Sequence, residues 1–160
     1  MTRIGFGGGC HWCTEAVFQS LHGVDRVEQG FIRSAPPHDA WSEAVIVHFE
    51  PARIDLATLV EAHLHTHAAT RRHRLRDKYR SAVYTFNDAQ TSLVKTILQD
   101  LQAMFHEPLV TGVLPFAGFR QSEPRFHDYY RRNPSRPFCQ RHIEPKLTLI
   151  RQRFSHRIRE

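Results

Sequence analysis

The 160-residue chain has few cysteines, no long apolar run and no internal repeats. Its three cysteines, an odd number, do not make a disulfide scaffold, and such sparse cysteine is typical of a reducing cytoplasm. No run of about 18 apolar residues occurs, so we expect no membrane-spanning helix. The N-terminus lacks the pattern of a secretory signal peptide. We therefore expect a cytoplasmic protein without a membrane partner.

The chain also lacks a block of basic residues, although its formal net charge is +6. Most positive residues are arginines scattered along the chain, and aromatic residues do not interleave with them as in nucleic-acid-binding motifs. Basic charge can attract nucleic acid, but this dispersed pattern favours a protein with no nucleic-acid partner. The length and an apolar fraction of 41% suffice for a single domain over residues 1–160, which we expect to be a monomer.

Hydrophobic periodicity predicts alternating strands and helices. Residues 43–49 give the clearest strand, because Val45, Val47 and Phe49 share one face. The first six predicted elements follow the order βαββαβ. This order predicts an α+β fold: a two-layer sandwich with a ferredoxin-like core and a mostly antiparallel sheet. Strands are predicted at 3–6, 24–32, 43–49, 82–86 and 109–114, and helices at 13–21, 56–64, 87–105, 126–130 and 146–158.

A glycine run introduces the segment with the clearest chemical signal. Gly7, Gly8 and Gly9 follow a short apolar strand, so the backbone can turn sharply and deliver Cys10 to the first turn of a helix. The free N–H groups and dipole of a helix start favour the thiolate, which is the nucleophilic form of cysteine. The pattern predicts a reactive thiol at Cys10, with Trp12 as an apolar wall beside it.

Cys10 also fits spacings that are typical of other cysteine sites. A lone cysteine is commonly a small buried apolar residue, and the glycine run is what favours reactivity here. Cys10 and Cys13 form a C-x-x-C pair, which suits redox exchange or half of a zinc site. Cys139 and His142 form a C-x-x-H pair. A non-catalytic zinc-stabilised module with these four ligands is therefore the alternative hypothesis, although zinc would occupy the thiolate.

Other polar residues are candidates for handling a substrate oxygen. Glu43 begins an apolar strand, where a carboxylate is either a solvated strand end or, if it points into a pocket, a general acid. The tyrosines are typical of core aromatics with a solvated hydroxyl, but a pocket hydroxyl beside a thiol can hold an oxygen. The alternating histidines of residues 63–67 end a predicted helix, so we expect no metal site there. The tyrosines concerned are Tyr79, Tyr84, Tyr129 and Tyr130, of which Tyr129 is a candidate substrate-binding residue.

Several short segments combine into one ordered pattern over nearly the whole chain. They are Gly9–Phe18, Gly23–Val24, Ser42–Val45, Tyr79–Ala82, Tyr129–Pro134, Pro137–Gln140 and Pro145–Leu147. Together they resemble the A-type peptide-methionine sulfoxide reductases, and they occur in that family's order. The first segment and the Tyr-Arg-Ser-Ala segment are the most specific parts of this resemblance.

The resemblance implies a thiol-dependent enzyme that uses no metal and no organic cofactor. The family reduces the S-epimer of methionine sulfoxide, free or in proteins, and is recycled by thioredoxin. By this resemblance Cys10 is the nucleophile, Glu43 is the acid, and Tyr79 helps to hold the sulfoxide oxygen. His11 and Trp12 correspond to the aromatic pair that walls the methyl pocket.

The chemistry of sulfoxide reduction agrees with these roles. Sulfoxide sulfur becomes electrophilic when its oxygen is protonated, so Glu43 would give a proton while the Cys10 thiolate attacks. Methionine leaves, and Cys10 becomes a sulfenic acid. A second thiol then forms a disulfide, which an external dithiol reduces. Cys13 is favoured as this resolving thiol because it is nearest in sequence, and Cys139, which matches a cysteine of many relatives, is the candidate relay.

The chain departs from the family's pattern at three places. His11 stands where the family usually has phenylalanine, which adds polarity to the methyl pocket. The loop after the second strand is cut to residues 33–40, and the pocket tyrosine of the longer loop has no match. Trp41 or Phe31 is expected to fill that gap, and Trp41 is a candidate substrate-binding residue. Arg74 stands where the family has an acidic residue that supports hydrogen bonding on the oxygen side.

Overall fold

Residues 2–71 and 78–158 are described in the computed structural model, which leaves the prediction for Arg74 outside the described residues. The strands are β1 (Thr2–Gly7), β2 (Val24–Arg33), β3 (Ser42–Phe49), β4 (Ala82–Thr85), β5 (Gly112–Pro115) and β6 (Gly118–Gln121). The α-helices are α1 (His11–Gln19), α2 (Leu56–His65), α3 (Asp88–Leu101), α4 (Tyr129–Arg132) and α5 (Glu144–Arg153). Short 3₁₀ helices cover Gln102–Met104, Pro124–Phe126 and Ser155–Arg157, and a π-helical turn covers Cys139–Ile143. No helix within the described ranges is long and apolar enough to cross a membrane.

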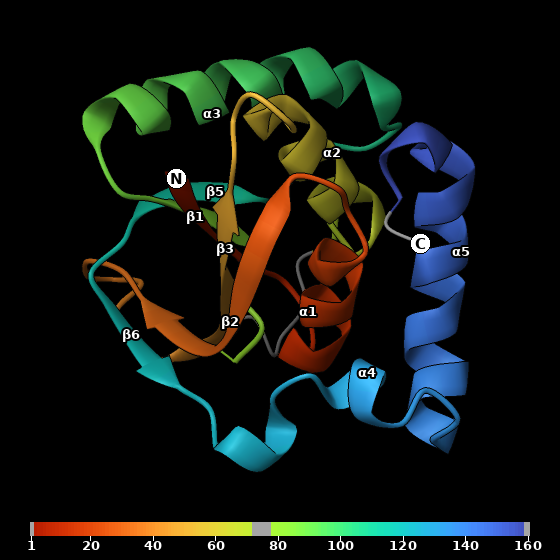
Figure 1. Cartoon of the computed structure of the whole chain (residues 1–160). Coiled ribbons are helices and arrows are strands. Elements are labelled where there is room, and N and C mark those ends of the chain that lie inside the picture. Colours follow the sequence, from red (N-terminus) through yellow and green to blue (C-terminus); the bar gives the residue numbers. More distant parts are fainter. Residues whose placement is uncertain (1, 72–77, 159–160) are drawn as a thin grey trace.

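The strands form one sheet in the order β5-β4-β1-β3-β2-β6. β3 lies between β1 and β2 and is antiparallel to both, and β4 is antiparallel to β1. This arrangement confirms the predicted βαββαβ core and the mostly antiparallel sheet. β5 pairs with β4 in parallel, and β6 pairs with β2 in antiparallel. Figure 1 shows β6 beside β2 at the edge of the sheet that lies away from α3.

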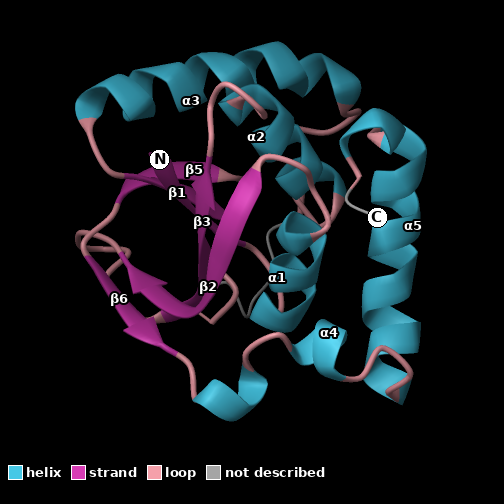
Figure 2. Cartoon of the chain, viewed as in Figure 1, coloured by secondary structure: helices cyan, strands magenta, loops and turns pink. Residues whose placement is uncertain are grey.

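The two faces of the sheet are covered differently. One face packs against α1, α2 and α3 through an apolar core that includes Phe6, Phe18 and Val47. The other face is closed by the curl of the sheet itself, around a smaller cluster that includes Ile46 and Tyr84. Figure 2 shows the curled magenta strands with the helices gathered over one side. The side chains of the helix-covered face therefore lie next to α1, and that is where the predicted site residues must meet.

Local sequence signals set the helix starts. Asp55 accepts a hydrogen bond from the Thr58 N–H at 2.9 Å, and Asn87 accepts one from the Gln90 N–H at 2.8 Å. Both caps satisfy N–H groups that a helix start leaves unpaired, as the spacing predicted. α1 begins at His11, two residues before the predicted start, so Cys10 is its N-cap residue.

The turn before α1 depends on a glycine. Gly8 has φ +154°, and a Cβ on it would lie 2.4 Å from Cδ2 of His67. Any side chain at that position is both strained and blocked. The His67 ring is itself fixed, because its Nε2 lies 2.7 Å from the Ser81 hydroxyl. The turn that presents Cys10 is thus tied to the start of β4.

The helices predicted at 126–130 and 146–158 lie at Tyr129–Arg132 and Glu144–Arg153, and two parts of the sheet also differ from the prediction. The strand predicted over 109–114 begins only at Gly112, because the Leu109 N–H donates to the Gln102 side chain at 2.9 Å instead of to a strand. The strand β6 was not predicted at all. Its sequence Gly-Phe-Arg-Gln is short and shows no apolar alternation, and pairing with β2 is what makes it a strand.

Candidate active site

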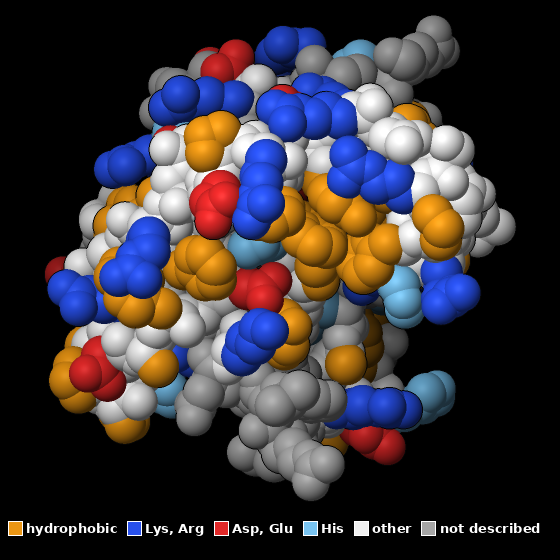
Figure 3. All heavy atoms as spheres, turned by 90° about the horizontal axis from the view of Figure 1, so that it is seen from below, with side chains coloured by type: hydrophobic (Ala, Val, Ile, Leu, Met, Phe, Trp, Pro, Cys, Tyr) orange, Lys and Arg blue, Asp and Glu red, His pale blue; other side chains and the backbone are white. Residues whose placement is uncertain are grey.

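A pocket of about 630 Å³ lies at the start of α1. Figure 3 views the molecule from the side on which α1 begins, and on this face apolar side chains gather in the middle with Lys and Arg side chains around them. The predicted residues that line the pocket are Cys10, His11, Trp12, Phe31, Glu43 and Tyr79. The pocket therefore unites residues from α1, β2, β3 and the segment before β4.

Cys10 is partly buried at the helix start. Its carbonyl accepts hydrogen bonds from the N–H groups of Cys13 at 3.1 Å and Thr14 at 3.2 Å. A hydrogen bond with Cys13 and burial raise the pKa of the Cys10 thiol, and the negative charges of Cys13 and Glu43 act in the same direction. The Trp12 N–H at the helix start favours the thiolate but is outweighed. Burial and the neighbouring Cys13 therefore oppose the thiolate of Cys10 that the helix start favours.

Cys13 is the other half of this thiol pair. The hydrogen bond from Cys10 lowers the pKa of Cys13, and the positive charge of Lys146 acts in the same direction, although burial opposes both. Cys13 is therefore the hydrogen-bonded neighbour of Cys10 at the helix start. All three cysteines are unpaired in the structure.

Glu43 points into the pocket from the start of β3 and is only 8% exposed. Its Oε1 accepts a hydrogen bond from the His11 N–H at 3.2 Å, and its Oε2 lies 3.9 Å from Nζ of Lys78. The Glu43 N–H donates to the Lys78 carbonyl at 2.8 Å, which ties the acid to the segment that carries Tyr79. Of the two interpretations left open by the sequence, the structure favours the pocket carboxyl over the solvated strand end.

His11 is buried and hydrogen-bonded behind Glu43. Its Nδ1 lies 2.9 Å from the Gly30 carbonyl oxygen, which can only accept, so Nδ1 carries a proton. Burial lowers the pKa of His11 despite the opposing negative charge of Glu43. The imidazole is therefore neutral at neutral pH. It packs edge-on against Phe31, with the ring centroids 5.3 Å apart.

Trp12 is held by an aromatic group behind the pocket. Its ring stacks on Tyr129 with the centroids 4.2 Å apart and an interplanar angle of 8°. Phe126 and Phe138 pack on it at 5.4 and 5.3 Å, and both also line the pocket. Tyr129 itself is not among the pocket-lining side chains of the described residues. Tyr129 instead supports Trp12 by stacking on its ring.

Trp41 also lies outside the set of described pocket-lining residues. The guanidinium groups of Arg33 and Arg120 lie over its ring, 5.1 and 4.8 Å from the centroid. Of these two arginines, Arg120 lines the pocket. Phe31, the other residue considered for the shortened loop, is the one that forms a wall of the pocket.

The second and third thiols lie in one cluster behind α1. Cys13 and Cys139 belong to the same buried apolar group as Ile143 and Leu147, and Cys139 is fully buried. No group of three or more His, Cys, Asp or Glu in the described ranges is arranged to hold a metal ion. The His142 side chain is exposed, with its ring 4.9 Å from that of Phe138. The four-ligand zinc site of the alternative hypothesis is therefore not assembled.

Glu15 organises the support of the pocket, and the sequence analysis assigned it no role. It is 2% exposed and accepts hydrogen bonds from the Gln29 amide at 2.9 Å and from the N–H groups of Asp128 at 3.0 Å and Tyr129 at 3.3 Å. These bonds fix Tyr129, and through it Trp12. In the sequence, the sign of this buried role was an acidic residue on an otherwise apolar face of the predicted helix.

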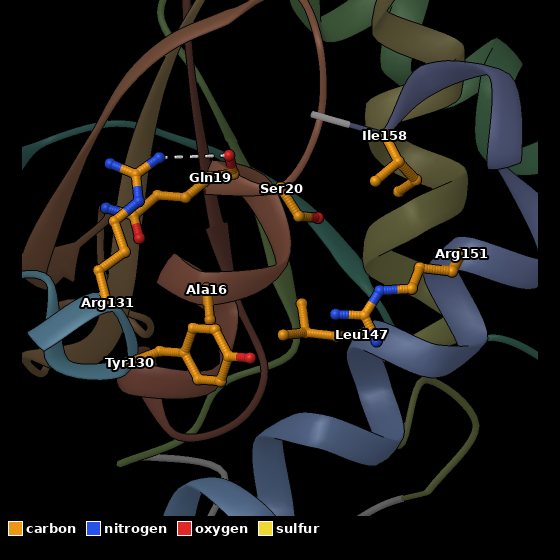
Figure 4. Close-up of a pocket in the computed structure, with 8 residues that line it drawn as sticks. All are labelled: Ala16, Gln19, Ser20, Tyr130, Arg131, Leu147, Arg151 and Ile158. Carbon is orange, nitrogen blue, oxygen red and sulfur yellow. Dashed lines mark hydrogen bonds between the residues drawn. The ribbon is translucent and has the colours of Figure 1, made fainter. Parts of the chain in front are cut away.

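A second pocket, of about 220 Å³, lies at the other end of α1 and is drawn in Figure 4. Its charged groups are already paired. Arg131 lies 3.9 Å from Asp128, Arg151 lies 3.8 Å from Glu144, and the Tyr130 hydroxyl donates to Glu144. The residues that line it are Ala16, Gln19, Ser20, Tyr130, Arg131, Leu147, Arg151 and Ile158.

Known proteins resemble this chain over most of its length. A sequence profile described as peptide methionine sulfoxide reductase matches residues 2–158. Peptide methionine sulfoxide reductase MsrA of Chromobacterium violaceum is 33% identical, over 98% of this chain and 98% of that protein. The structure of methionine sulfoxide reductase A of Corynebacterium diphtheriae superposes with a TM-score of 0.69 at 25% identity, over 82% of this chain and 74% of that one. Mxr1 of Saccharomyces cerevisiae in complex with Trx2 has the same fold, with a TM-score of 0.62 at 19% identity over 76% and 81% of the two chains.

Proposed function

Because the chain belongs to the peptide methionine sulfoxide reductase family, we propose that it reduces the S-epimer of methionine sulfoxide, free or in proteins, to methionine. The observation that carries this proposal is one pocket that contains both the Cys10 thiol and the buried Glu43 carboxyl, the latter held by the His11 N–H at 3.2 Å. A nucleophile and a proton donor on either side of a bound sulfoxide are the two groups that its reduction requires.

The reaction then proceeds in balanced steps. The Glu43 carboxyl donates a proton to the sulfoxide oxygen while the Cys10 sulfur attacks the substrate sulfur, and the thiol proton of Cys10 passes to Cys13. The new bond between the Cys10 sulfur and the substrate sulfur and the substrate's sulfur–oxygen bond both break as the oxygen passes to Cys10 as a hydroxyl, so that methionine leaves and Cys10 becomes a sulfenic acid. Tyr79 orients the oxygen, and Trp12 and His11 hold the methyl group.

A disulfide follows from the sulfenic acid. We propose that Cys13 attacks it and releases water, because Cys13 is the hydrogen-bonded neighbour of Cys10. Cys139 lies in the same buried cluster as Cys13 and is the proposed relay thiol that takes over the disulfide. A thioredoxin dithiol reduces the last disulfide, and the Trx2 complex of the yeast relative supports this partner. Three unpaired thiols fit a reducing cytoplasm as the setting.

The decisive assay uses the separated R and S epimers of N-acetyl-methionine sulfoxide amide, with a thioredoxin system or dithiothreitol as reductant. The S-epimer should be consumed, and the Cys10→Ser variant should not consume it above the uncatalysed rate. A far-UV circular dichroism spectrum establishes that the variant is folded. Consumption of neither epimer by the wild-type protein, or full activity of folded Cys10→Ser, would overturn the proposal.

Mapping the disulfide tests the order of the thiols. After one turnover without reductant, mass spectrometry of the proteolysed protein should find a bond between Cys10 and Cys13. In Cys139→Ser that first bond should still form, whereas reduction by thioredoxin should slow. A bond between Cys10 and Cys139 as the first product would contradict the proposed order.

A further inference from the structure

Three adjacent strands place an acid, an apolar side chain and a cation in one row. In the sheet register, Glu43 of β3 lies opposite Phe31 of β2, and Phe31 lies opposite Arg120 of β6. Directly opposite residues of antiparallel strands project from the same face of the sheet. All three side chains line the pocket. Because neighbouring strands are about 4.8 Å apart, the Cα atoms of Glu43 and Arg120 are separated by about 10 Å.

Arg120 differs from the other cations beside the pocket. Lys78 already faces the Glu43 carboxylate at 3.9 Å, and Arg125 is paired with Glu123 at 2.8 Å. No carboxylate of the described residues forms an ion pair with Arg120. Its guanidinium lies 4.8 Å from the centroid of the Trp41 ring, which positions it while leaving its five N–H groups in the plane free to bind an acceptor.

From this row we propose that Arg120 binds a substrate carboxylate close to the sulfoxide, so that the enzyme prefers methionine sulfoxide with a negative charge beside it. Guanidinium and carboxylate match in geometry and can share two parallel hydrogen bonds. When the sulfoxide oxygen is bound at Glu43, the flexible side chain of methionine sulfoxide lies across Phe31. The substrate backbone is then directed toward Arg120. The inference rests on the proposed function and adds a substrate preference to it.

The basic rim supports the same preference. Figure 3 shows Lys and Arg side chains around the apolar patch on the face where α1 begins. Such a rim attracts an anionic substrate from a distance, but it does so for every anion. The contact with Arg120 is what would depend on the position of the carboxylate. The carboxylate can be the α-carboxylate of the free amino acid or a neighbouring Asp or Glu side chain, and the substrates below separate these sources.

The test compares kcat/KM within two pairs of neutral and charged substrates. N-acetyl-methionine (S)-sulfoxide is paired with its carboxamide, and a capped peptide with Glu after the sulfoxide is paired with the same peptide with Gln there. The wild-type enzyme should prefer the charged member of at least one pair by about fivefold to tenfold, mainly through KM. Preference in the first pair alone identifies the α-carboxylate as the ligand, and preference in the second alone identifies a neighbouring side chain.

Two arginine variants separate contact from general charge. Arg120→Gln should reduce the preference to within about twofold, and Arg120→Lys should retain part of it. Arg33→Gln is the matched control: it removes the same charge from the same Trp41 ring, but Arg33 does not line the pocket. Arg33→Gln should keep the wild-type preference.

The outcomes are distinct from a failure of the proposed function. If the wild-type enzyme reduces none of the four substrates, the proposed function is wrong and the inference goes with it. If all four are reduced without preference, or if the preference survives in Arg120→Gln, only the role of Arg120 is wrong. An equal loss in Arg33→Gln and Arg120→Gln would also overturn it, since net charge would then explain the result.

Discussion

A pocket lies at each end of α1. Both pockets are lined by charged and apolar side chains, but their charged groups are used differently. At the N-terminal end, Cys10 and Glu43 face one space, and the Glu43 carboxyl is held by a single backbone N–H and a lysine at 3.9 Å. At the C-terminal end, Arg131 and Arg151 line a smaller space, but each faces its own carboxylate within 4 Å. A pocket with charged walls is therefore not in itself a site for chemistry.

The difference lies in which groups are left with capacity to react. Around Cys10 and Glu43 the partners are a second thiol, a backbone N–H, an imidazole and an exposed lysine, and no arginine in the described part of the chain is paired with either group. Around Arg151 the charged side chains neutralise one another, and the hydrogen bond from Tyr130 to Glu144 joins α4 to α5. The first pocket keeps its reactive groups available, whereas the second uses its charged groups for structure.

We expect the largest difference in kcat between a variant of the catalytic pocket and a variant of the second pocket when Glu43 is replaced. Glu43→Gln keeps the shape and the hydrogen bond from His11 but removes the proton donor, so kcat should fall by about 10² to 10³. Rapid-quench measurement of methionine release in a single turnover gives the rate directly. Glu144→Gln, at the other pocket, is the matched control and should keep the wild-type rate. An undiminished rate in Glu43→Gln would remove the general-acid role.

Glu15, in the middle of α1, supports the catalytic pocket but is not one of its reactive groups. Replacing it therefore tests the structural part of the contrast between the two pockets. Glu15→Ala leaves the N–H groups of Asp128 and Tyr129 without their buried acceptor, which should lower the free energy of unfolding by about 2–3 kcal/mol. Urea denaturation monitored by tryptophan fluorescence measures this loss. Glu61→Ala removes an acid whose partner in the structure is His65 at 3.7 Å, and should cost less than about 0.5 kcal/mol. Equal losses in the two variants would contradict the assigned role of Glu15.

A histidine in the catalytic pocket predicts a pH effect. Burial lowers the pKa of His11 below its value in the unfolded chain, so the unfolded state binds the proton first as pH falls. This contribution to stability is present above the unfolded pKa of about 6.5 and decreases below it, by at most about 1.4 kcal/mol per pH unit until the folded pKa is reached.

The variant His11→Phe removes that titration. Its loss of stability between pH 7 and pH 5 should therefore be smaller than that of the wild-type protein, whatever its stability at pH 7. Urea denaturation curves at both pH values, with the thiols kept reduced, give the comparison. A loss as large as that of the wild type would show that His11 is protonated in the folded protein.

The smallest effect is expected at the second pocket. Arg151→Gln breaks an ion pair in which the arginine side chain is 53% exposed, so the free energy of unfolding should change by no more than about 0.5 kcal/mol. The rate of sulfoxide reduction should stay the same. A tenfold change in kcat would show that the two ends of α1 are coupled and that the contrast drawn above is wrong.

The sequence predicted those features that depend on neighbouring residues. Asp55 and Asn87 cap their helices because a cap acts over three residues, and Val45, Val47 and Phe49 mark β3 because alternation is local. The core order βαββαβ follows from such local elements. The glycines before Cys10 indicated a reactive thiol, whereas the adjacent sequence left the role of Glu43 open and the resemblance to the reductase family assigned it.

The features that were missed depend on contacts between distant segments. β6 is a strand only because Phe31 and its neighbours offer an edge, and the pairing of Arg120 with that edge cannot be read from the sequence around it. Glu15 finds its partners 14, 113 and 114 residues away. The pKa of Cys10 is raised by its hydrogen bond with Cys13, by burial and by the charge of Glu43, none of which the glycines before it indicate.

Gly9 has no side chain, so the space immediately before the Cys10 sulfur is open. A Cβ placed there would have no neighbour within 4 Å, whereas one on Gly8 would collide with His67. An alanine at position 9 would thus fit the resting fold but would narrow the approach from outside. Filling the open space beside Gly9 would therefore be expected to change the rate at which substrate reaches Cys10 and to leave the stability of the fold unchanged.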